Sequence, residues 1–156
     1  MKNFDYYINE DSYNDLNNEK CYNDLSNAIK CKTISKINQN EMDFNEFYKL
    51  HAYLKKSFPI VTSLSDVEII NKGSMIWHIK GNKDLKEVLF MAHLDVVSIV
   101  NGTLDDWDYN PFSGKVTEEF IYGRGSEDIK CMVIAYLEAL EYLFSKKYSY
   151  LFCYNL

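Results

Sequence analysis

Five consecutive apolar residues at positions 88–92 predict a strand, because a short apolar run between polar residues is typical of a buried strand. Such runs are most common in parallel α/β sheets, whose strands are covered on both faces. His93-Leu94-Asp95 follows at once, and alternate side chains of a strand point the same way, so His93 and Asp95 should project together. Open α/β sheets place their sites at this end of the strands. An imidazole beside a carboxylate suits zinc binding, although a histidine that only caps the strand is the alternative.

A glycine-rich motif, Gly123-Arg124-Gly125-Ser126-Glu127-Asp128, brings a second candidate ligand 35 positions after His93. Its glycines allow a tight backbone path where a Cβ would clash. Apolar residues recur at helical spacing over residues 129–144, which places Asp128 at the start of a predicted helix. The helix dipole favours a carboxylate there, and a carboxylate can bridge two cations. The alternative is that Asp128 or Ser126 is simply an N-cap.

The rest of the pattern predicts helices and short strands around these motifs. Helices are expected at residues 23–30 and from Asp43 to just before Pro59, which cannot continue a helix. Strands are expected at residues 67–70 and 75–79, a turn at 80–83, and a hairpin of strands at 115–117 and 120–122. These elements predict an α/β fold with a partial mixed or parallel sheet flanked by helices. Residues 1–20 are polar and weakly periodic, so we expect a flexible N-terminus.

Composition argues against several classes of function. The formal net charge of −6 disfavours nucleic-acid binding, which uses basic surfaces. No apolar run approaches the ~20 residues that span a bilayer, and the first residues show no signal-peptide pattern. We therefore expect a cytoplasmic protein without a membrane or nucleic-acid partner, with the vacuole and secretion as open alternatives. The four cysteines form no regular framework, which predicts reduced thiols.

Three stretches in order resemble the aminoacylase/carboxypeptidase S family of zinc peptidases, which includes acetylornithine deacetylase and succinyl-diaminopimelate desuccinylase. They are residues 91–97, then Trp107 with residues 111–114, and finally residues 121–130. The stretch from Trp107 to Pro-Phe-Ser-Gly is similar to the Gly-Xaa carboxypeptidase and N-acyl-amino-acid hydrolase branch. The resemblance extends from about Leu25 to Phe144. It implies that residues 21–156 are the N-terminal portion of a metallopeptidase catalytic domain whose C-terminal part and dimerisation domain are absent.

The resemblance assigns a role to each candidate site residue. It implies that His93 binds one zinc, that Asp128 bridges two zinc ions, and that Asp95 is the catalytic-site carboxylate that orients His93. The zinc ions would polarise the scissile carbonyl and activate a water for a general-base glutamate. The implied reaction is hydrolysis of an amide bond next to a free carboxylate, in a peptide or an N-acyl amino acid.

The sequence departs from the family after the predicted helix. The family has a Glu-Glu pair on the next strand, whereas the strand-like residues 148–156 contain no acidic residue. Glu138 and Glu141 lie inside the preceding helix and are poor substitutes. His51, predicted to be partly exposed, and His78, predicted on a solvent-facing strand position, are weak replacement ligands. The chain alone is therefore expected to be inactive, and a homodimer is expected only if the missing domain exists.

Three hypotheses follow from this pattern. The first is a truncated fragment of a zinc carboxypeptidase or N-acyl-amino-acid hydrolase. The second is a catalytically inactive short relative that acts as a binding or interaction module. The third is an unrelated α/β domain whose motifs match by chance. The substrate side chain, the acyl group and the metal are not fixed by the sequence.

Overall fold

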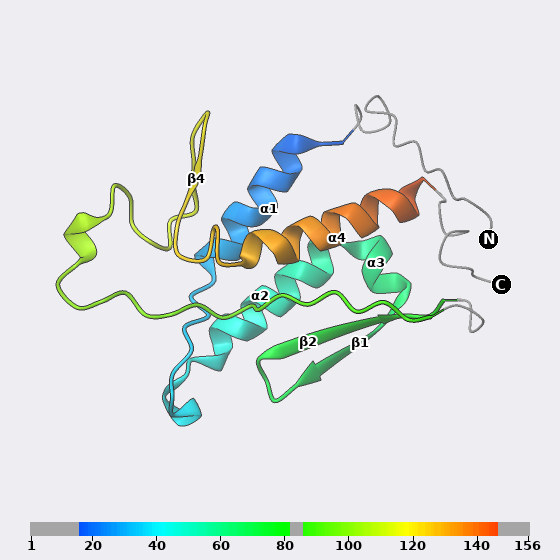
Figure 1. The fold of residues 1–156 in the computed structure, drawn as a ribbon, viewed down its shortest axis with the longest axis horizontal. Helices are drawn as coiled ribbons and strands as arrows, with labels where there is room; N and C mark the ends of the chain where they lie inside the picture. Colours follow the sequence, from blue (N-terminus) through cyan, green and yellow to red (C-terminus); the bar gives the residue numbers. More distant parts are fainter. Residues whose placement is uncertain (1–15, 82–85, 147–156) are drawn as a thin grey trace.

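The computed structural model describes residues 16–81 and 86–146 of the 156-residue chain. Helices make up most of its body, and a β-hairpin lies beside them (Figure 1). A second, shorter hairpin precedes the last helix. In chain order the main elements are α1 (Asn18–Lys30), α2 (Phe44–Ser57), α3 (Pro59–Ser63), β1 (Ser65–Ile70), β2 (Ser74–Ile79), β3 (Lys115–Val116), β4 (Ile121–Tyr122) and α4 (Lys130–Ser145).

Helix ends follow local capping chemistry. The side chain of Asn17 accepts a hydrogen bond from the backbone of Lys20, and Asp43 accepts one from Asn45, so each satisfies a free N–H of a first turn. Pro59 stands at the first position of α3, where its missing N–H costs nothing. These contacts confirm the predicted helices: α1 begins five residues earlier than expected, at Asn18, and α2 ends at Ser57, before Pro59.

Both hairpins are antiparallel. β1 pairs with β2 from Ser65 opposite Ile79 to Ile70 opposite Ser74, and β3 pairs with β4 over two residue pairs. The predicted α/β class is confirmed. Part of the predicted turn at 80–83 and the strand-like residues 148–156 lie outside the described residues. No helix of the described residues is both long and apolar enough to cross a membrane.

Residues 88–92 differ from the prediction of a buried strand. They are extended, but among the described residues no strand pairs with them, and Val88, Leu89 and Met91 are 75–80% exposed. Phe90 contacts α4, with its ring centre 5.3 Å from that of Tyr136, but it is itself 60% exposed. The apolar pattern indicates that residues 88–92 favour burial, but it does not show which strands would pair with them. Within the described residues, the parallel pairing is an isolated bridge between Ile34 and Val96.

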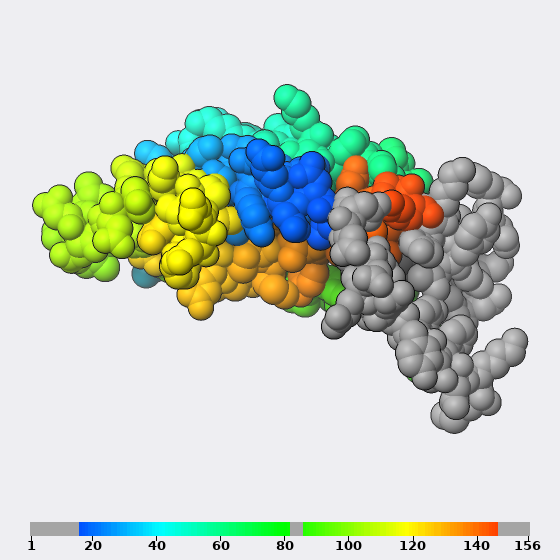
Figure 2. Space-filling model, turned by 90° about the horizontal axis from the view of Figure 1, so that it is seen from above, coloured from blue at the N-terminus to red at the C-terminus, as the bar shows by residue number. Residues whose placement is uncertain are grey.

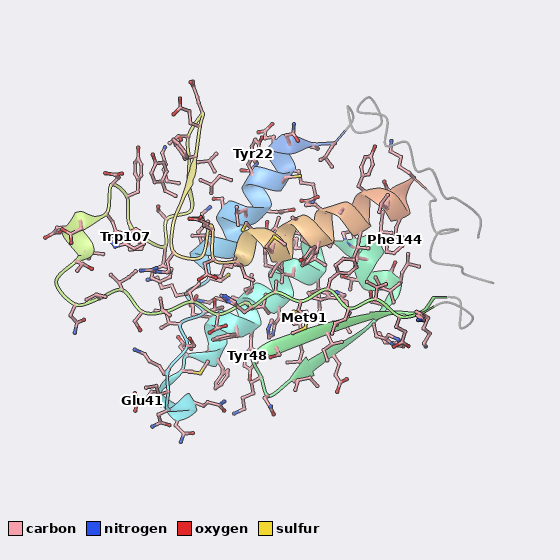
Figure 3. All side chains as sticks on the ribbon, viewed as in Figure 1. Tyr22, Glu41, Tyr48, Met91, Trp107 and Phe144 are labelled. Carbon is pink, nitrogen blue, oxygen red and sulfur yellow. The ribbon has the colours of Figure 1, made fainter. Side chains whose placement is uncertain are left out.

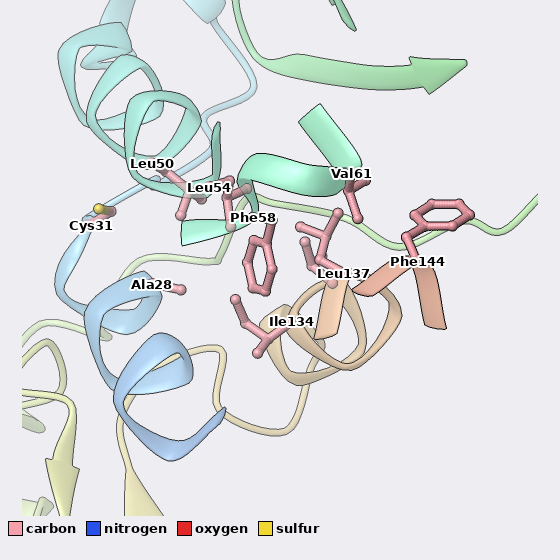
Figure 4. Close-up of a cluster of buried hydrophobic side chains, with 10 residues drawn as sticks. Ala28, Cys31, Leu50, Leu54, Phe58, Val61, Ile134, Leu137 and Phe144 are labelled. Carbon is pink, nitrogen blue, oxygen red and sulfur yellow. The ribbon is translucent and has the colours of Figure 1, made fainter. Parts of the chain in front are cut away.

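The core lies between the four helices (Figure 4). Leu54, Phe58 and Val61 from α2, α3 and their junction are completely buried, and Ile134 and Leu137 of α4 face them. The loop around residues 100–110 extends to one end of the molecule, away from this core (Figure 2). Along the chain, the candidate ligand His93 precedes this loop and Asp128 follows the second hairpin.

Candidate metal centre

His93 lies at the end of the extended run and contacts both other predicted site residues. Its Nε2 is 3.0 Å from Oδ1 of Asp128, and its Nδ1 is 2.9 Å from the carbonyl oxygen of Asp95. The Asp95 carboxylate is somewhat farther, with Oδ1 3.5 Å from Nδ1. The structure therefore brings together the three residues that the sequence singled out, although the nearest Asp95 atom is a backbone oxygen rather than the carboxylate.

These contacts determine the proton arrangement on the His93 ring. Both ring nitrogens face oxygen acceptors, so each favours carrying a proton. Burial lowers the pKa of His93, but hydrogen bonds to the Asp95 carbonyl and the Asp128 carboxylate outweigh it, so the net pKa is raised. A metal that replaced the Nε2 proton would leave the Nδ1–H donating to Asp95, which is the usual arrangement of a metal-binding histidine.

The backbone around Asp128 is tightly folded. Gly125 has φ +88°, and a Cβ there would lie 2.7 Å from Cγ1 of Val96. Gly123 is as confined, since a Cβ would lie 2.4 Å from Ile29. The predicted need for glycine at both positions is thus explained by close backbone approach. α4 begins two residues after Asp128, at Lys130, and its N-cap position is Ile129, so neither Asp128 nor Ser126 is the N-cap of this helix.

A cavity of about 600 Å³ opens beside the three residues. Trp107 and Arg124 also line it, and the Arg124 guanidinium lies 5.0 Å from the Trp107 ring centre. Trp107 belongs to the loop at one end of the molecule (Figure 3). Arg124, the single arginine of the chain, thus makes a cation–π contact with Trp107. The side chains of His93, Asp95 and Asp128 are 47%, 41% and 85% exposed, so solvent reaches them.

The donor set fits part of a zinc site. Two ligands at 2.0–2.1 Å from a tetrahedral zinc lie about 3.3 Å apart, close to the 3.0 Å between His93 Nε2 and Asp128 Oδ1. Among residues 16–81 and 86–146, no group of three or more His, Cys, Asp or Glu side chains is arranged so that all could hold one metal ion. The described residues therefore provide a pair of donors, fewer than the four of a complete zinc shell.

The other histidines are far less suitable as ligands. His51 is only 4% exposed, and its Nε2 contacts the Gly73 carbonyl at 3.0 Å, so the prediction that it is partly exposed is wrong. Its helix turns it toward the β1–β2 turn, which the helical pattern alone does not reveal. His78 occupies an exposed position of β2, as predicted.

Two buried residues beside the candidate site, Thr33 and Lys130, have no role predicted from the sequence. Thr33 is completely buried, and its hydroxyl donates to the Leu94 carbonyl at 2.7 Å. Lys130 is 1% exposed, and burial lowers its pKa to about 8. Lys130 lies in residues 121–130, one of the three stretches that resemble the zinc peptidase family, and this position was the sequence signal for it. No local sequence pattern indicates a role for Thr33, because its hydrogen-bond partner, Leu94, lies 61 residues away.

Comparison with known proteins supports the motifs. Residues 89–151 match the model of peptidase family M20/M25/M40, whose members are generally metal-dependent. The resemblance inferred from three motifs is confirmed over this part of the chain. It is 39% identical to carboxypeptidase S of Saccharomyces cerevisiae over 125 residues, which is 75% of the chain and 22% of that protein.

Other relatives give the same picture. The chain is 39% identical to a putative carboxypeptidase, YOL153C, of Saccharomyces cerevisiae, over 72% of the chain and 20% of the relative. It is 37% identical to the N-fatty-acyl-amino acid synthase/hydrolase PM20D1 of Mus musculus, over 78% of the chain and 24% of the relative. The chain thus spans less than a quarter of the length of these three relatives. No solved structure gave a significant match.

Proposed function

We propose that this chain contributes to a metal-dependent hydrolase that cleaves an amide bond next to a free carboxylate. The observation that carries the proposal is the 3.0 Å approach of His93 Nε2 and Asp128 Oδ1, with the other ring nitrogen held by Asp95. The names of the relatives support the substrate class, since a carboxypeptidase and an N-fatty-acyl-amino acid hydrolase both act beside an amino-acid carboxylate. The substrate is then a peptide or an N-acyl amino acid.

Each site residue has a separate task in this proposal. His93 offers Nε2 to the metal, and Asp95 holds Nδ1–H, which fixes the ring orientation and the tautomer. Asp128, whose Oδ1 lies beside His93 Nε2, would hold the metal with its carboxylate. Bound zinc would supply Lewis acidity and a water of lowered pKa. Trp107 and Arg124 line the cavity into which a substrate would extend.

We further propose that the chain by itself binds metal without turning over substrate. A general-base carboxylate and further donors are needed, and the acidic residues of α4 are engaged elsewhere. Glu138 pairs with Lys20 at 2.7 Å, while Glu141 accepts hydrogen bonds from the backbone of Ile60 and Val61. These contacts explain why Glu138 and Glu141 are poor substitutes for the family's Glu-Glu pair.

Metal titration of the 156-residue chain tests the site. Cobalt added to the chain should shift the NMR signals of the His93 ring, and Asp128→Asn should weaken binding at least tenfold because a charged donor is lost. Asp95→Asn should weaken binding less, since the nearest Asp95 contact to His93 is a backbone carbonyl that the substitution retains. Asp108→Asn, in the exposed loop, is the matched control and should change nothing. Unchanged binding in Asp128→Asn would exclude the proposed site.

The transcript and a hydrolysis assay test the reaction. If the reading frame continues past Leu156 with a Glu-Glu pair, the longer polypeptide with zinc should hydrolyse an N-acyl amino acid and not its C-terminal amide. The 156-residue chain should leave both intact. A confirmed stop codon, together with metal binding and no turnover, would favour the inactive binding module instead.

A further inference from the structure

One short segment of the chain, residues 28–35, contacts both halves of the candidate metal centre. It comprises the last turn of α1 and the extended residues that follow it. His93 and Asp95 come from the run before the projecting loop, whereas Asp128 comes from the glycine-rich turn after the second hairpin. The 3.0 Å separation of His93 and Asp128 therefore depends on what holds these two parts together.

Lys130 ties the Asp128 side to this segment. Its Nζ donates to the carbonyl oxygens of Ala28 at 2.9 Å and Cys31 at 2.7 Å, which lie at the C-terminal end of α1. Its backbone N–H donates to the Gly125 carbonyl at 3.0 Å, closing the turn that carries Asp128. A buried ammonium at a helix C-terminus satisfies carbonyls that the helix leaves free, and it is favoured by the helix dipole.

Thr33 ties the His93 side to the same segment. Its hydroxyl donates to the carbonyl of Leu94, the residue between His93 and Asp95, at 2.7 Å. The backbone N–H of Val96 donates to the Thr33 carbonyl at 2.9 Å, and that of Ser35 donates to the Val96 carbonyl at 3.0 Å. Three hydrogen bonds thus fix residues 94–96 against residues 33–35, and Thr33 is completely buried.

We infer that Thr33 and Lys130 are positioning residues that set the distance between His93 and Asp128 by fixing both to residues 28–35. Neither residue contacts the proposed metal, and the role assigned to them rests on the proposed function. A purely structural role is the alternative. The two differ in one measurable respect: a positioning residue affects metal affinity beyond its effect on stability.

The chain offers matched controls for both substitutions. Lys130→Met removes the buried ammonium. Lys20→Met removes another ammonium that pairs with Asp24 within α1 and links α1 to Glu138 of α4 without contacting the site. Thr33→Val removes a hydroxyl that donates to a carbonyl at 2.7 Å, and Thr62→Val removes a hydroxyl of α3 that donates at the same distance to the carbonyl of Phe58, the N-cap residue of that helix. Thr33→Ser keeps the hydroxyl and should rescue the Thr33→Val defect.

Cobalt affinity, followed by the paramagnetic shift of the His93 ring, decides between the two roles. Lys130→Met and Thr33→Val should each weaken binding by about tenfold or more, as is typical when a residue supporting a metal ligand is lost. Lys20→Met and Thr62→Val should lower the thermal midpoint yet bind within twofold of the parent chain. The double variant should lose less than the product of the single losses, because both act on one distance. Affinities of Lys130→Met and Thr33→Val within twofold of the parent would overturn the inference.

Hydrogen exchange gives a second readout that needs no metal. Thr33→Val should speed amide exchange at residues 93–97, and Lys130→Met should speed it at residues 123–130, while Lys20→Met leaves both segments unchanged. If the parent chain binds no cobalt, the proposed function fails and the role at a metal site fails with it; this exchange pattern would then support only the attachment of residues 93–97 and 123–130 to residues 28–35. Unchanged exchange at both segments would overturn it. If Lys130→Met does not fold, the Thr33→Val and Thr33→Ser pair carries the same comparison.

Discussion

The three histidines of the chain occupy three different environments. His93 faces two acceptors at the candidate metal centre, His78 faces solvent on β2, and His51 is buried in α2. Burial lowers the pKa of His51, and nearby Lys55 adds to this, while the hydrogen bond to the Gly73 carbonyl partly opposes it. The folded protein therefore favours neutral His51, protonated on Nε2 so that it donates to Gly73.

Acidification should destabilise the fold through His51. The unfolded chain takes up a proton near the usual pKa of 6.5, and the folded chain does so only at lower pH, so unfolding gains protons between these values. Stability should thus fall as the pH drops below about 6.5. Urea unfolding at pH 7.5 and 5.5 should show a smaller pH effect in His51→Gln than in the parent. His78→Gln, the control, should behave like the parent, and equal pH effects in all three would contradict the prediction.

At the scale of residues, the sequence predicted the members of the site better than their contacts. His93, Asp95 and Asp128 were identifiable because an apolar run that ends in His-Leu-Asp and a glycine-rich turn are local signals. The burial of His51 and the contacts of Thr33 depend on partners 22 and 61 residues away. Spacing along the chain contains no information about such partners.

At the scale of elements, α3 depends on a side chain from another helix. α3 is five residues long, and the carboxylate of Glu141 on α4 accepts hydrogen bonds from Ile60 N at 3.0 Å and Val61 N at 2.8 Å. A carboxylate at a helix N-terminus satisfies free N–H groups and interacts favourably with the helix dipole. This cap joins α3 to α4 beside the buried Val61.

Removing this cap should destabilise the protein. Glu141→Ala should lower the free energy of unfolding by about 1–2 kcal/mol, as for other lost N-caps, whereas Glu141→Gln should lose less because its amide oxygen still accepts. Glu119→Ala, in the exposed β3–β4 turn, is the matched control and should change little. Chemical denaturation measures all three. A Glu141→Ala variant as stable as Glu119→Ala would show that the cap contributes nothing.

Helix ends were predictable where caps and proline act locally, as at Asp43 and Pro59. The strands of both hairpins were predictable because turn residues and alternation lie within a few positions of each other, but the pairing was predicted only for β3 and β4. The strand at residues 88–92 was not, because a strand becomes part of a sheet only through neighbours that its own residues do not specify. The cap from Glu141 to α3 also spans about 80 residues and leaves no local signal.

At the scale of the whole molecule, residues 88–91 form an exposed apolar stretch with extended backbone. Val88, Leu89, Phe90 and Met91 are 75%, 80%, 60% and 75% exposed. Met91 lies on the long extended run of the chain (Figure 3). Among the described residues its backbone pairs with no strand, and unpaired apolar strands promote aggregation.

The purified chain should therefore self-associate, and charges on one face of the stretch should reduce this. Leu89→Lys combined with Met91→Lys should lower static light scattering several-fold at equal concentration, because alternate residues of an extended run share a face. Ile37→Lys, at an isolated exposed apolar residue, should have little effect. Equal scattering from the parent and the double variant would show that the chain self-associates through another surface.

The chain segment that connects the two halves of the candidate metal centre is not what keeps them together. The chain leaves the body after Val96, passes the exposed Gly102, and returns at Gly114. Residues 28–35 hold the chain on both sides of this excursion. A backbone cut between Asn101 and Gly102 would therefore yield two pieces that stay associated, with His93 on one and Asp128 on the other. The geometry of this site therefore does not require an unbroken backbone between His93 and Asp128.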